Sequence, residues 1–186
     1  MSSGITPYKV HVSNERIGLL RQKLALTTFP DCECPLRRMR SVLMADGCSL
    51  KEVEGFGWDL GTPLSEVKRL ARVWETDFDW RTAEKTINKL PHFTTDIAVD
   101  GFETLNVHFI HAKSPIQGAI PLLFGHGWPG GFWEASKMLP ILTSGGGEAV
   151  PTFDVVVPSL PGYGFSEGFR GKGFGLLQVS TMSLIF

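Results

Sequence analysis

The sequence predicts an α/β fold, in which a helical and irregular N-terminal segment precedes the first strands and helix of a parallel-sheet core. Two observations lead to this prediction. Before residue 94 the signals are helical or irregular, whereas after it they are strands, turns and glycines. From Ile120 to Val157 the order is apolar strand, glycine-rich turn, helix and apolar strand, which is typical of a βαβ unit with a right-handed crossover.

Three helices are expected in the N-terminal segment. Ser13 is the candidate N-cap of the first, because apolar residues follow it at helical spacing over 17–24. Thr62 as N-cap and Pro63 as the first helical residue predict the start of the second helix. A third, shorter helix is predicted over 82–90. The stretch between the first two helices is irregular and rich in proline and glycine.

A β-hairpin is predicted next. Segments 95–99 and 103–112 flank Asp100-Gly101, which is a strong signal for a tight turn between two strands. Polar and apolar residues alternate in the second segment, which favours a half-exposed strand. We therefore expect His108 and His111 to be ordinary polar positions on that strand, with no Ser or Cys partner.

The second half of the chain has the pattern of a covered sheet. Residues 120–124 and 153–157 are short apolar runs of the kind found in strands that are covered on both faces. A helix over 132–142 is expected between them.

Composition restricts the class of protein. With 186 residues, 42% of them hydrophobic, and a net charge of −1, the chain has the profile of a soluble globular protein with no electrostatic preference for nucleic acid or an anionic membrane. Three cysteines give no disulfide framework, and Cys32-Glu33-Cys34 has no second ligand pair for a metal. The sequence has no signal-peptide pattern and no membrane-spanning run, so a cytoplasmic location is expected.

The most informative motif is Leu122–Gly131, which lies between a predicted strand and a predicted helix. Its glycines allow a sharp turn, and Pro129 fixes a bend without offering a donor. The remaining backbone amides, chiefly that of Trp128, can point at a developing oxyanion. The Trp128–Pro129 bond is a candidate cis peptide. The alternative interpretation is a tight turn that only connects the strand to the helix.

A second glycine and proline motif, Val157–Ser166, directly follows a predicted buried strand. Ligands bind beyond the carboxyl ends of strands in open α/β sheets, so both motifs are expected on the same rim. Two interpretations stay open for this loop: it packs beneath the pocket, or it contacts substrate directly.

These motifs resemble those of a known family. Residues 122–131 and 157–166 resemble the HGxP and PSxPGxGxS segments of epoxide hydrolases. Further matches resemble the N-terminal region of the microsomal-like and fungal branch: residues 77–81, Glu84, Asn88, residues 91–93 and residues 108–111. The resemblance covers about residues 5–177, which is nearly the whole chain.

The resemblance implies a domain organisation. Residues 5–112 would be the epoxide hydrolase N-terminal region, and residues 113–178 the N-terminal part of an incomplete α/β-hydrolase core. Residues 179–186 do not resemble the family. A Gln codon followed by a splice-donor string would be translated as Gln-Val-Ser, so we expect this tail to be intron read-through.

The resemblance also implies a mechanism. In the intact family an Asp attacks an epoxide carbon, tyrosines of the cap protonate the opening oxygen, and a His with a carboxylate partner activates the water that releases a diol. Neither a cofactor nor a metal is needed, and the substrate is a small-molecule epoxide. Only His126, Gly127, Trp128 and Pro129 match a site motif, with Trp128 on the oxyanion side.

The nucleophile and the base are expected to be missing from this chain. The family Asp lies on a sharp strand-to-helix turn, and no such element follows Ser166. Asp77, Asp79 and Asp154 do not lie on a turn of that kind, and His126 is expected to be a structural residue of its loop. We therefore expect a fragment of an epoxide hydrolase that is inactive alone and has poor independent stability.

Two alternatives remain open at this stage. The chain could be a fragment of another α/β-hydrolase, such as a haloalkane dehalogenase or an esterase, although residues 79–81 argue against this. It could also be a non-catalytic binding or regulatory protein that pairs with a full-length relative, or with itself, through an exposed sheet edge.

Overall fold

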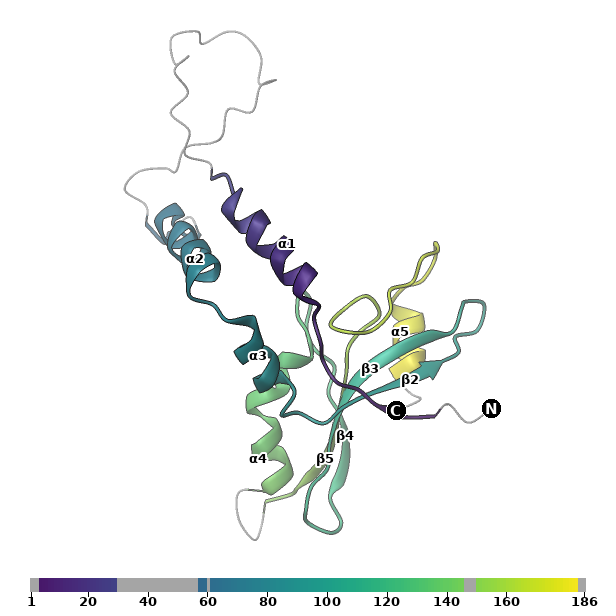
Figure 1. The fold of residues 1–186 in the computed structure, drawn as a ribbon. Helices are drawn as coiled ribbons and strands as arrows, with labels where there is room; N and C mark the ends of the chain where they lie inside the picture. The colour runs from purple at the N-terminus through teal and green to yellow at the C-terminus, as the bar shows by residue number, and fades with distance from the viewer. Residues whose placement is uncertain (1–3, 30–56, 60, 146–149, 184–186) are drawn as a thin grey trace, which may run out of the picture. The chain divides into compact units, whose positions relative to one another are not determined.

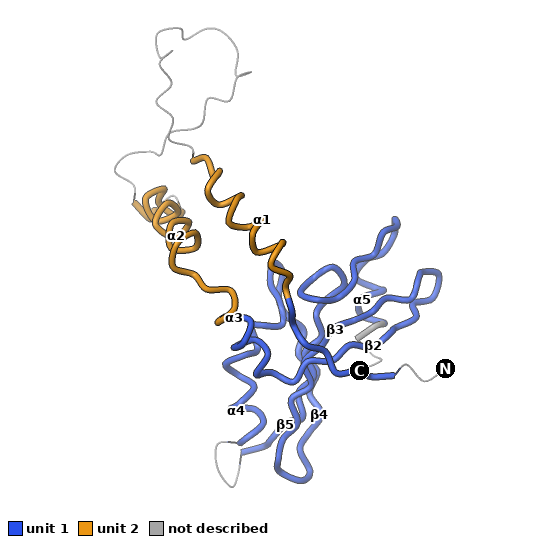
Figure 2. Tube along the Cα trace, viewed as in Figure 1, with its two compact units in different colours: residues 1–11, 83–186 blue, residues 12–82 orange. Residues whose placement is uncertain are grey.

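The computed structural model describes residues 4–29, 57–59, 61–145 and 150–183. By its contacts the chain divides into two compact units, which Figure 2 colours separately. We call residues 12–82 the helical unit, and residues 1–11 with 83–186 the sheet unit. The family regions expected at 5–112, 113–178 and 179–186 stay predictions, and the three cysteines lie outside the described residues.

The helical unit contains the first predicted helix, which is confirmed. Helix α1 spans Asn14–Ala25, and Ser13 is its N-cap, because its Oγ accepts a hydrogen bond from the Arg16 backbone N at 3.3 Å. A cap of this type satisfies one of the backbone N–H groups that the first turn leaves without an intrahelical acceptor. Among the described residues, no helix is both long and apolar enough to pass through a bilayer.

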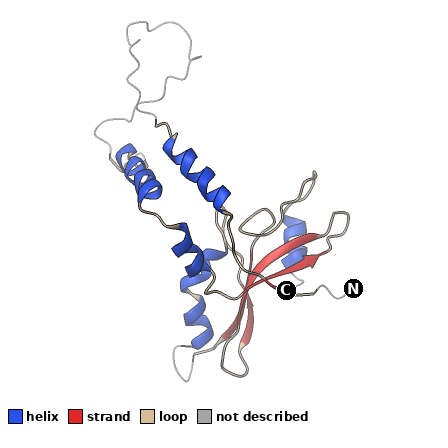
Figure 3. Cartoon of the chain, viewed as in Figure 1, coloured by secondary structure: helices blue, strands red, loops and turns tan. Residues whose placement is uncertain are grey.

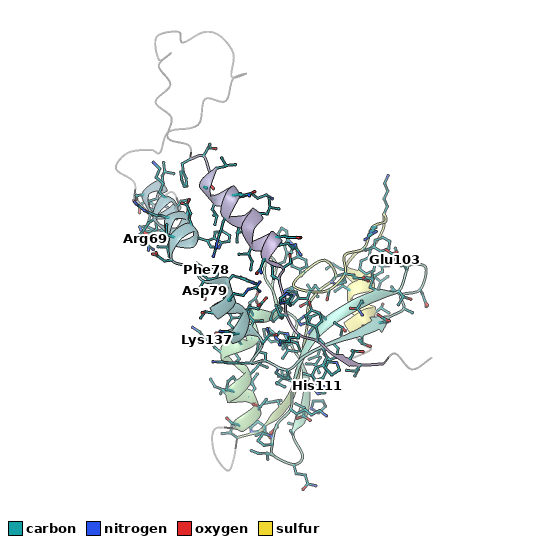
Figure 4. All side chains as sticks on the ribbon, in the orientation of Figure 1. Arg69, Phe78, Asp79, Glu103, His111 and Lys137 are labelled. Carbon is teal, nitrogen blue, oxygen red and sulfur yellow. The ribbon has the colours of Figure 1, made fainter. Side chains whose placement is uncertain are left out.

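The starts of the next two helices differ from the prediction. Helix α2 spans Leu64–Thr76 and its N-cap is Pro63, whose ψ of 144° is extended, so Thr62 is not the cap. Helix α3 spans Trp80–Ile87, two residues earlier at its start than predicted. Asp79, labelled in Figure 4, determines this start: its carboxylate accepts hydrogen bonds from the Arg81 N at 3.0 Å and the Thr82 N at 3.1 Å.

The sheet unit is built on one mixed sheet, in red in Figure 3. Five described strands follow the order β1–β2–β3–β5–β4. The pairs β1–β2, β2–β3 and β3–β5 are antiparallel, whereas β4 and β5 pair parallel, as the predicted βαβ unit requires. The strands span Thr6–Pro7 (β1), His92–Ile97 (β2), Leu105–Ala112 (β3), Ile120–Leu123 (β4) and Phe153–Pro158 (β5).

The predicted hairpin is confirmed. β2 and β3 pair in register from His92 with Ile110 to Ile97 with Leu105, and Gly101 takes a φ of 80° in the turn. Only glycine adopts this backbone conformation without steric cost, which explains the strength of the Asp-Gly signal.

The predicted helix over 132–142 is two helices. A 3₁₀ helix, η1, spans Phe132–Lys137, and α4 spans Leu139–Ser144 alongside β5 (Figure 1). Pro140 explains the break, because it has no N–H to donate to a carbonyl of the preceding turn and so interrupts a continuous α-helical ladder. A fifth α-helix, α5, spans Leu176–Ser183 and was not predicted.

β4 is not covered on both faces, so that prediction is wrong. β4 is an edge strand, and Ile120 and Leu123 remain 50% and 42% exposed. The apolar run alone could not distinguish an edge strand from a central one. β5, by contrast, is buried as predicted, with Val155 and Val157 fully enclosed.

The main core forms between the sheet and the helices that follow β4. Ile110, Val155 and Val157 of the sheet pack with Phe132, Ala135 and Leu139. A smaller cluster at the hairpin end combines Ile97, Val99, Leu105 and Val107. Each of the valine, leucine, isoleucine and phenylalanine side chains among them stabilises the folded state by about 1.5–3 kcal/mol when it is fully withdrawn from water.

Within the sheet unit, hydrogen bonds fix residues 8–10 to the rest of the unit. The Asn88 side chain accepts from the Val10 N and donates to the Val10 carbonyl, both at 2.9 Å. β1 pairs with β2, and the Tyr8 N donates to the His92 carbonyl at 2.9 Å. These contacts give Asn88, one of the residues that carried the family resemblance, a structural role.

His108 is the clearest correction in the sheet. It was predicted to be a half-exposed polar position, but it is completely buried and hydrogen-bonded at both ring nitrogens. His92 Nε2 lies 2.8 Å from the Ile87 carbonyl, His92 Nδ1 lies 2.8 Å from His108 Nε2, and His108 Nδ1 lies 2.8 Å from Ser159 Oγ. We call Ile87, His92, His108 and Ser159 the histidine row.

The direction of the hydrogen bonds in the histidine row follows from its first member. A carbonyl can only accept, so His92 Nε2 carries a proton and donates to Ile87. A neutral His92 then accepts at Nδ1 from His108 Nε2, and His108 accepts at Nδ1 from the Ser159 hydroxyl. In this arrangement both rings are neutral, in agreement with burial, which lowers the pKa of His92 as well as that of His108. Burial, and secondarily the nearby His92, lowers the pKa of His108 to about 3.

The histidine row predicts a pH-dependent stability. Unfolding exposes His108 and returns its pKa to 6.5, so the unfolded chain binds more protons than the folded chain as the pH falls from 6.5 towards about 3. The free energy of unfolding, measured by urea denaturation, should fall in that window with an added slope of about 1.4 kcal/mol per pH unit. Above this window His108 adds no pH dependence.

Two variants test this assignment. His108→Gln should lose the added slope and, at neutral pH, about 1–3 kcal/mol of stability, because buried partners lose their hydrogen bonds. His11→Gln, at an exposed histidine, should keep the slope of the wild type. An equal slope in wild type and His108→Gln would contradict the account of a buried neutral ring.

Candidate functional site

The first glycine motif forms the loop between β4 and η1, at the carboxyl end of a strand that is parallel to its neighbour. The Trp128–Pro129 peptide bond is cis, as expected. The Trp128 side chain is 81% exposed. Among the described residues, no acceptor bonds the Trp128 backbone N–H, so this amide is available to a ligand.

The amides on either side of Trp128-Pro129 are occupied by a carboxylate. Glu134, in the first turn of η1, accepts hydrogen bonds from the Gly127 N at 3.2 Å and from the Gly131 N at 3.0 Å. The hydrogen bond from Gly127, and then that from Gly131, lowers the pKa of Glu134 below its usual value. Sequence reasoning missed Glu134, although a Glu three residues after a helix N-cap is a known signal.

His126 connects the two glycine loops. Its Nδ1 donates to the Gly127 carbonyl at 2.9 Å, and its Nε2 accepts from the Leu160 N at 3.1 Å. The ring is buried, and both nitrogens are engaged, which leaves no lone pair for proton transfer to a substrate. The two loops therefore meet on the same rim, as the sequence predicts.

The second loop is held by its two serines. Ser159 ends the histidine row, and Ser166 Oγ donates to the Ser159 carbonyl at 2.7 Å and accepts from the His108 N at 2.9 Å. Gly164 has a φ of 53°, and a Cβ there would lie 2.6 Å from Ser159 Oγ. These contacts turn the serines inward, against the sheet.

The candidate carboxylates and histidines outside the loops have other partners. Asp154 Oδ1 accepts from the Ser114 N at 2.7 Å, and Asp79 caps α3. His111, on β3 in Figure 4, contacts the Phe93 ring, and burial is the first cause that lowers its pKa. Within the described part of the chain, the connections from β1 to α1, β4 to η1 and β5 to α5 contain no aspartate.

No metal centre is built from the described residues. In the ranges that the structure covers, no three His, Cys, Asp or Glu side chains are grouped to hold a metal ion. The helical unit contains an apolar cavity of about 400 Å³. Its lining residues are Leu20, Leu70, Val73, Trp74, Phe78 and Trp80.

Comparisons with known proteins agree on one family. A family model described as "Epoxide hydrolase N terminus" matches residues 5–135. Epoxide hydrolase 1 from Sus scrofa is 36% identical over 185 residues, covering 96% of this chain and 35% of that protein. The structure of Aspergillus niger epoxide hydrolase matches with a TM-score of 0.70 at 28% identity, covering 97% of this chain and 41% of that one.

A more distant structure supports the fold. Juvenile hormone epoxide hydrolase from the silkworm Bombyx mori superposes with a TM-score of 0.75 at 24% identity, covering 97% of this chain and 42% of that one. The chain thus spans 35% of the length of the curated pig relative and about two fifths of the solved structures. The family model covers well over half of this chain. The chain belongs to the epoxide hydrolase family, and its fold is the N-terminal part of the α/β-hydrolase fold.

Proposed function

We propose that this chain provides the oxyanion side of an epoxide hydrolase active site, with the Trp128 backbone amide as the donor and a small-molecule epoxide as the substrate. The observation that carries the proposal is the available Trp128 N–H in a loop whose other contacts are fixed by His126 and Glu134. Gly127, directly before Trp128, is itself held by His126 and Glu134, and Pro129 directly after it has no N–H to compete for an acceptor.

The chemistry gives the Trp128 amide a defined task. In the family, a carboxylate oxygen of Asp attacks an epoxide carbon, the ring C–O bond breaks, and the released oxygen takes a proton. Water, which gives a proton to the base His of the family, then attacks the ester carbonyl, and negative charge develops on the carbonyl oxygen. The ester C–O bond then breaks, which releases the diol and restores the Asp carboxylate. A backbone N–H aimed at that oxygen stabilises the charge without reorganising, and one donor of this kind is commonly worth about 10²–10³ in rate.

The described residues do not provide the nucleophile that the family mechanism requires. A nucleophilic aspartate on a strand-to-helix turn is required, and none of the three described connections of that kind contains one. Dehalogenation and ester hydrolysis, the two alternatives from the sequence, receive no support from a match to the epoxide hydrolase N terminus over residues 5–135.

This proposal predicts that the purified chain does not hydrolyse a fluorogenic epoxide above the solvent background. Pig epoxide hydrolase 1, assayed in parallel, is the positive control. Release of diol that co-elutes with the chain through two further purification steps would mean that one of its own carboxylates attacks the epoxide. In that case Asp154→Asn and Asp79→Asn, measured separately, would identify the carboxylate.

We also propose that the chain self-associates through the outer edge of β4. An edge strand offers unpaired backbone N–H and C=O groups to a second strand, and here it is flanked by exposed apolar side chains at Ile120 and Leu123. A second copy can satisfy these groups and cover the apolar surface at the same time.

Sedimentation of the chain over a range of concentrations tests the edge contact. Ile120→Lys should shift the distribution to monomer, because a buried unpaired ammonium at the edge opposes strand pairing. Ile116→Lys is the matched control: Ile116 is 47% exposed, Ile120 is 50% exposed, and Ile116 lies outside the strand. Equal sedimentation of the two variants and the wild type would remove the β4 edge as the contact.

A further inference from the structure

The Glu134 carboxylate forms the internal support of the loop that presents Trp128. One oxygen, Oε2, accepts from Gly127 N at 3.2 Å, and the other, Oε1, accepts from Gly131 N at 3.0 Å. These two amides stand immediately before Trp128 and immediately after Gly130, so the carboxylate spans the whole turn. Both bonds are charge-assisted, which makes them stronger than bonds between neutral groups.

Gly130 leaves the space that this carboxylate occupies. A Cβ at residue 130 would overlap Glu134 Oε1 and would also lie 2.6 Å from the Gly127 carbonyl. A Cβ at residue 131 would meet no atom within 4 Å, and the φ of −177° at Gly131 is open to any residue. The absence of a side chain is therefore required at Gly130 and not at Gly131, although both are glycines of the same motif.

The charge of Glu134 agrees with this arrangement. Its side chain is exposed, so its lowered pKa arises from the two backbone donors before any other cause, and His126 adds a smaller effect in the same direction. The carboxylate is ionised at neutral pH and holds two N–H groups away from a ligand. The Trp128 N–H, between them in sequence, is left for the substrate side.

We propose that Glu134 is a positioning residue that fixes the Trp128 amide by binding the amides of Gly127 and Gly131. This inference rests on the proposed role of Trp128, but it concerns the geometry of the loop and can be tested without turnover. Two variants should weaken the bonds from Glu134 to the Gly127 and Gly131 amides. Glu134→Gln removes the charge, and Gly130→Ala displaces the carboxylate.

Nuclear magnetic resonance of the full chain tests the inference. In the wild type, the Gly127 and Gly131 amide protons should titrate together, with one midpoint below the usual Glu value. In Glu134→Gln the titration should vanish, and hydrogen exchange at both amides should accelerate by about tenfold, as expected for loss of about 1.4 kcal/mol of protection. The ¹⁵N order parameter of Trp128 should fall in the same variant.

Matched controls separate positioning from general destabilisation. Gly130→Ala should reproduce the effects of Glu134→Gln, whereas Gly131→Ala should retain the paired titration. Glu103→Gln removes a carboxylate at the β2–β3 hairpin (Figure 4) and should leave the loop signals unchanged. In Glu134→Ala, added formate, a small carboxylate, should restore part of the Gly127 and Gly131 amide chemical shifts.

The outcomes discriminate between two hypotheses. Independent or absent titration of the two amides in the wild type would overturn the role of Glu134, and so would an unchanged Trp128 order parameter in Glu134→Gln. These measurements do not depend on catalysis. If the loop responds as expected while the oxyanion role of Trp128 fails in an activity assay, only the proposed function is lost.

Discussion

The buried contact between His108 and Ser159 is the interaction on which the arrangement of the site depends. His108 lies in the middle of β3, and Ser159 begins the loop that follows β5. Through His92 the same row reaches the Ile87 carbonyl at the end of α3. One chain of three hydrogen bonds thus connects a helix end, two strands and the second glycine loop, in a place where water cannot replace a lost partner.

The first glycine loop depends on the second. Leu160, next to Ser159, donates to His126, and His126 holds the Gly127 carbonyl. Glu134 then holds the amides of Gly127 and Gly131 from the other side. The loop has little secondary structure of its own, so its shape is determined by side chains that reach it from rigid elements. This is the arrangement expected of a preorganised backbone donor.

Much of the fold follows from local signals, and the deviations have physical causes. The hairpin was predictable because Asp100-Gly101 demands a left-handed turn, and the βαβ unit because apolar runs flank a glycine turn and a helix. The break at Pro140 and the cap at Asp79 are local effects, because a proline inside a helix and an aspartate before its first turn are both visible in the sequence. The burial of His108 and the exposure of β4 were not predictable from sequence pattern, because each depends on which strand lies next in the sheet. At the site, the motif predicts the role of Trp128. Glu134 has a sequence signal at its place after the N-cap, but its second bond, to Gly127, depends on how the loop folds back.

The pairing of β1 with β2 closes a long loop of the chain on itself. β1 ends at Pro7 and β2 begins at His92. The whole helical unit therefore lies, along the sequence, between two strands that are hydrogen-bonded to each other. Closing a loop costs entropy that grows only logarithmically, by about 0.6 kcal/mol for each doubling of its length. Insertions or deletions within the enclosed segment should therefore cost the sheet little, provided that the Asn88 bonds to Val10 and the His92 bond to Ile87 survive. The sheet should therefore tolerate a change in the length of the helical unit better than a change in the two short sequences that close the loop.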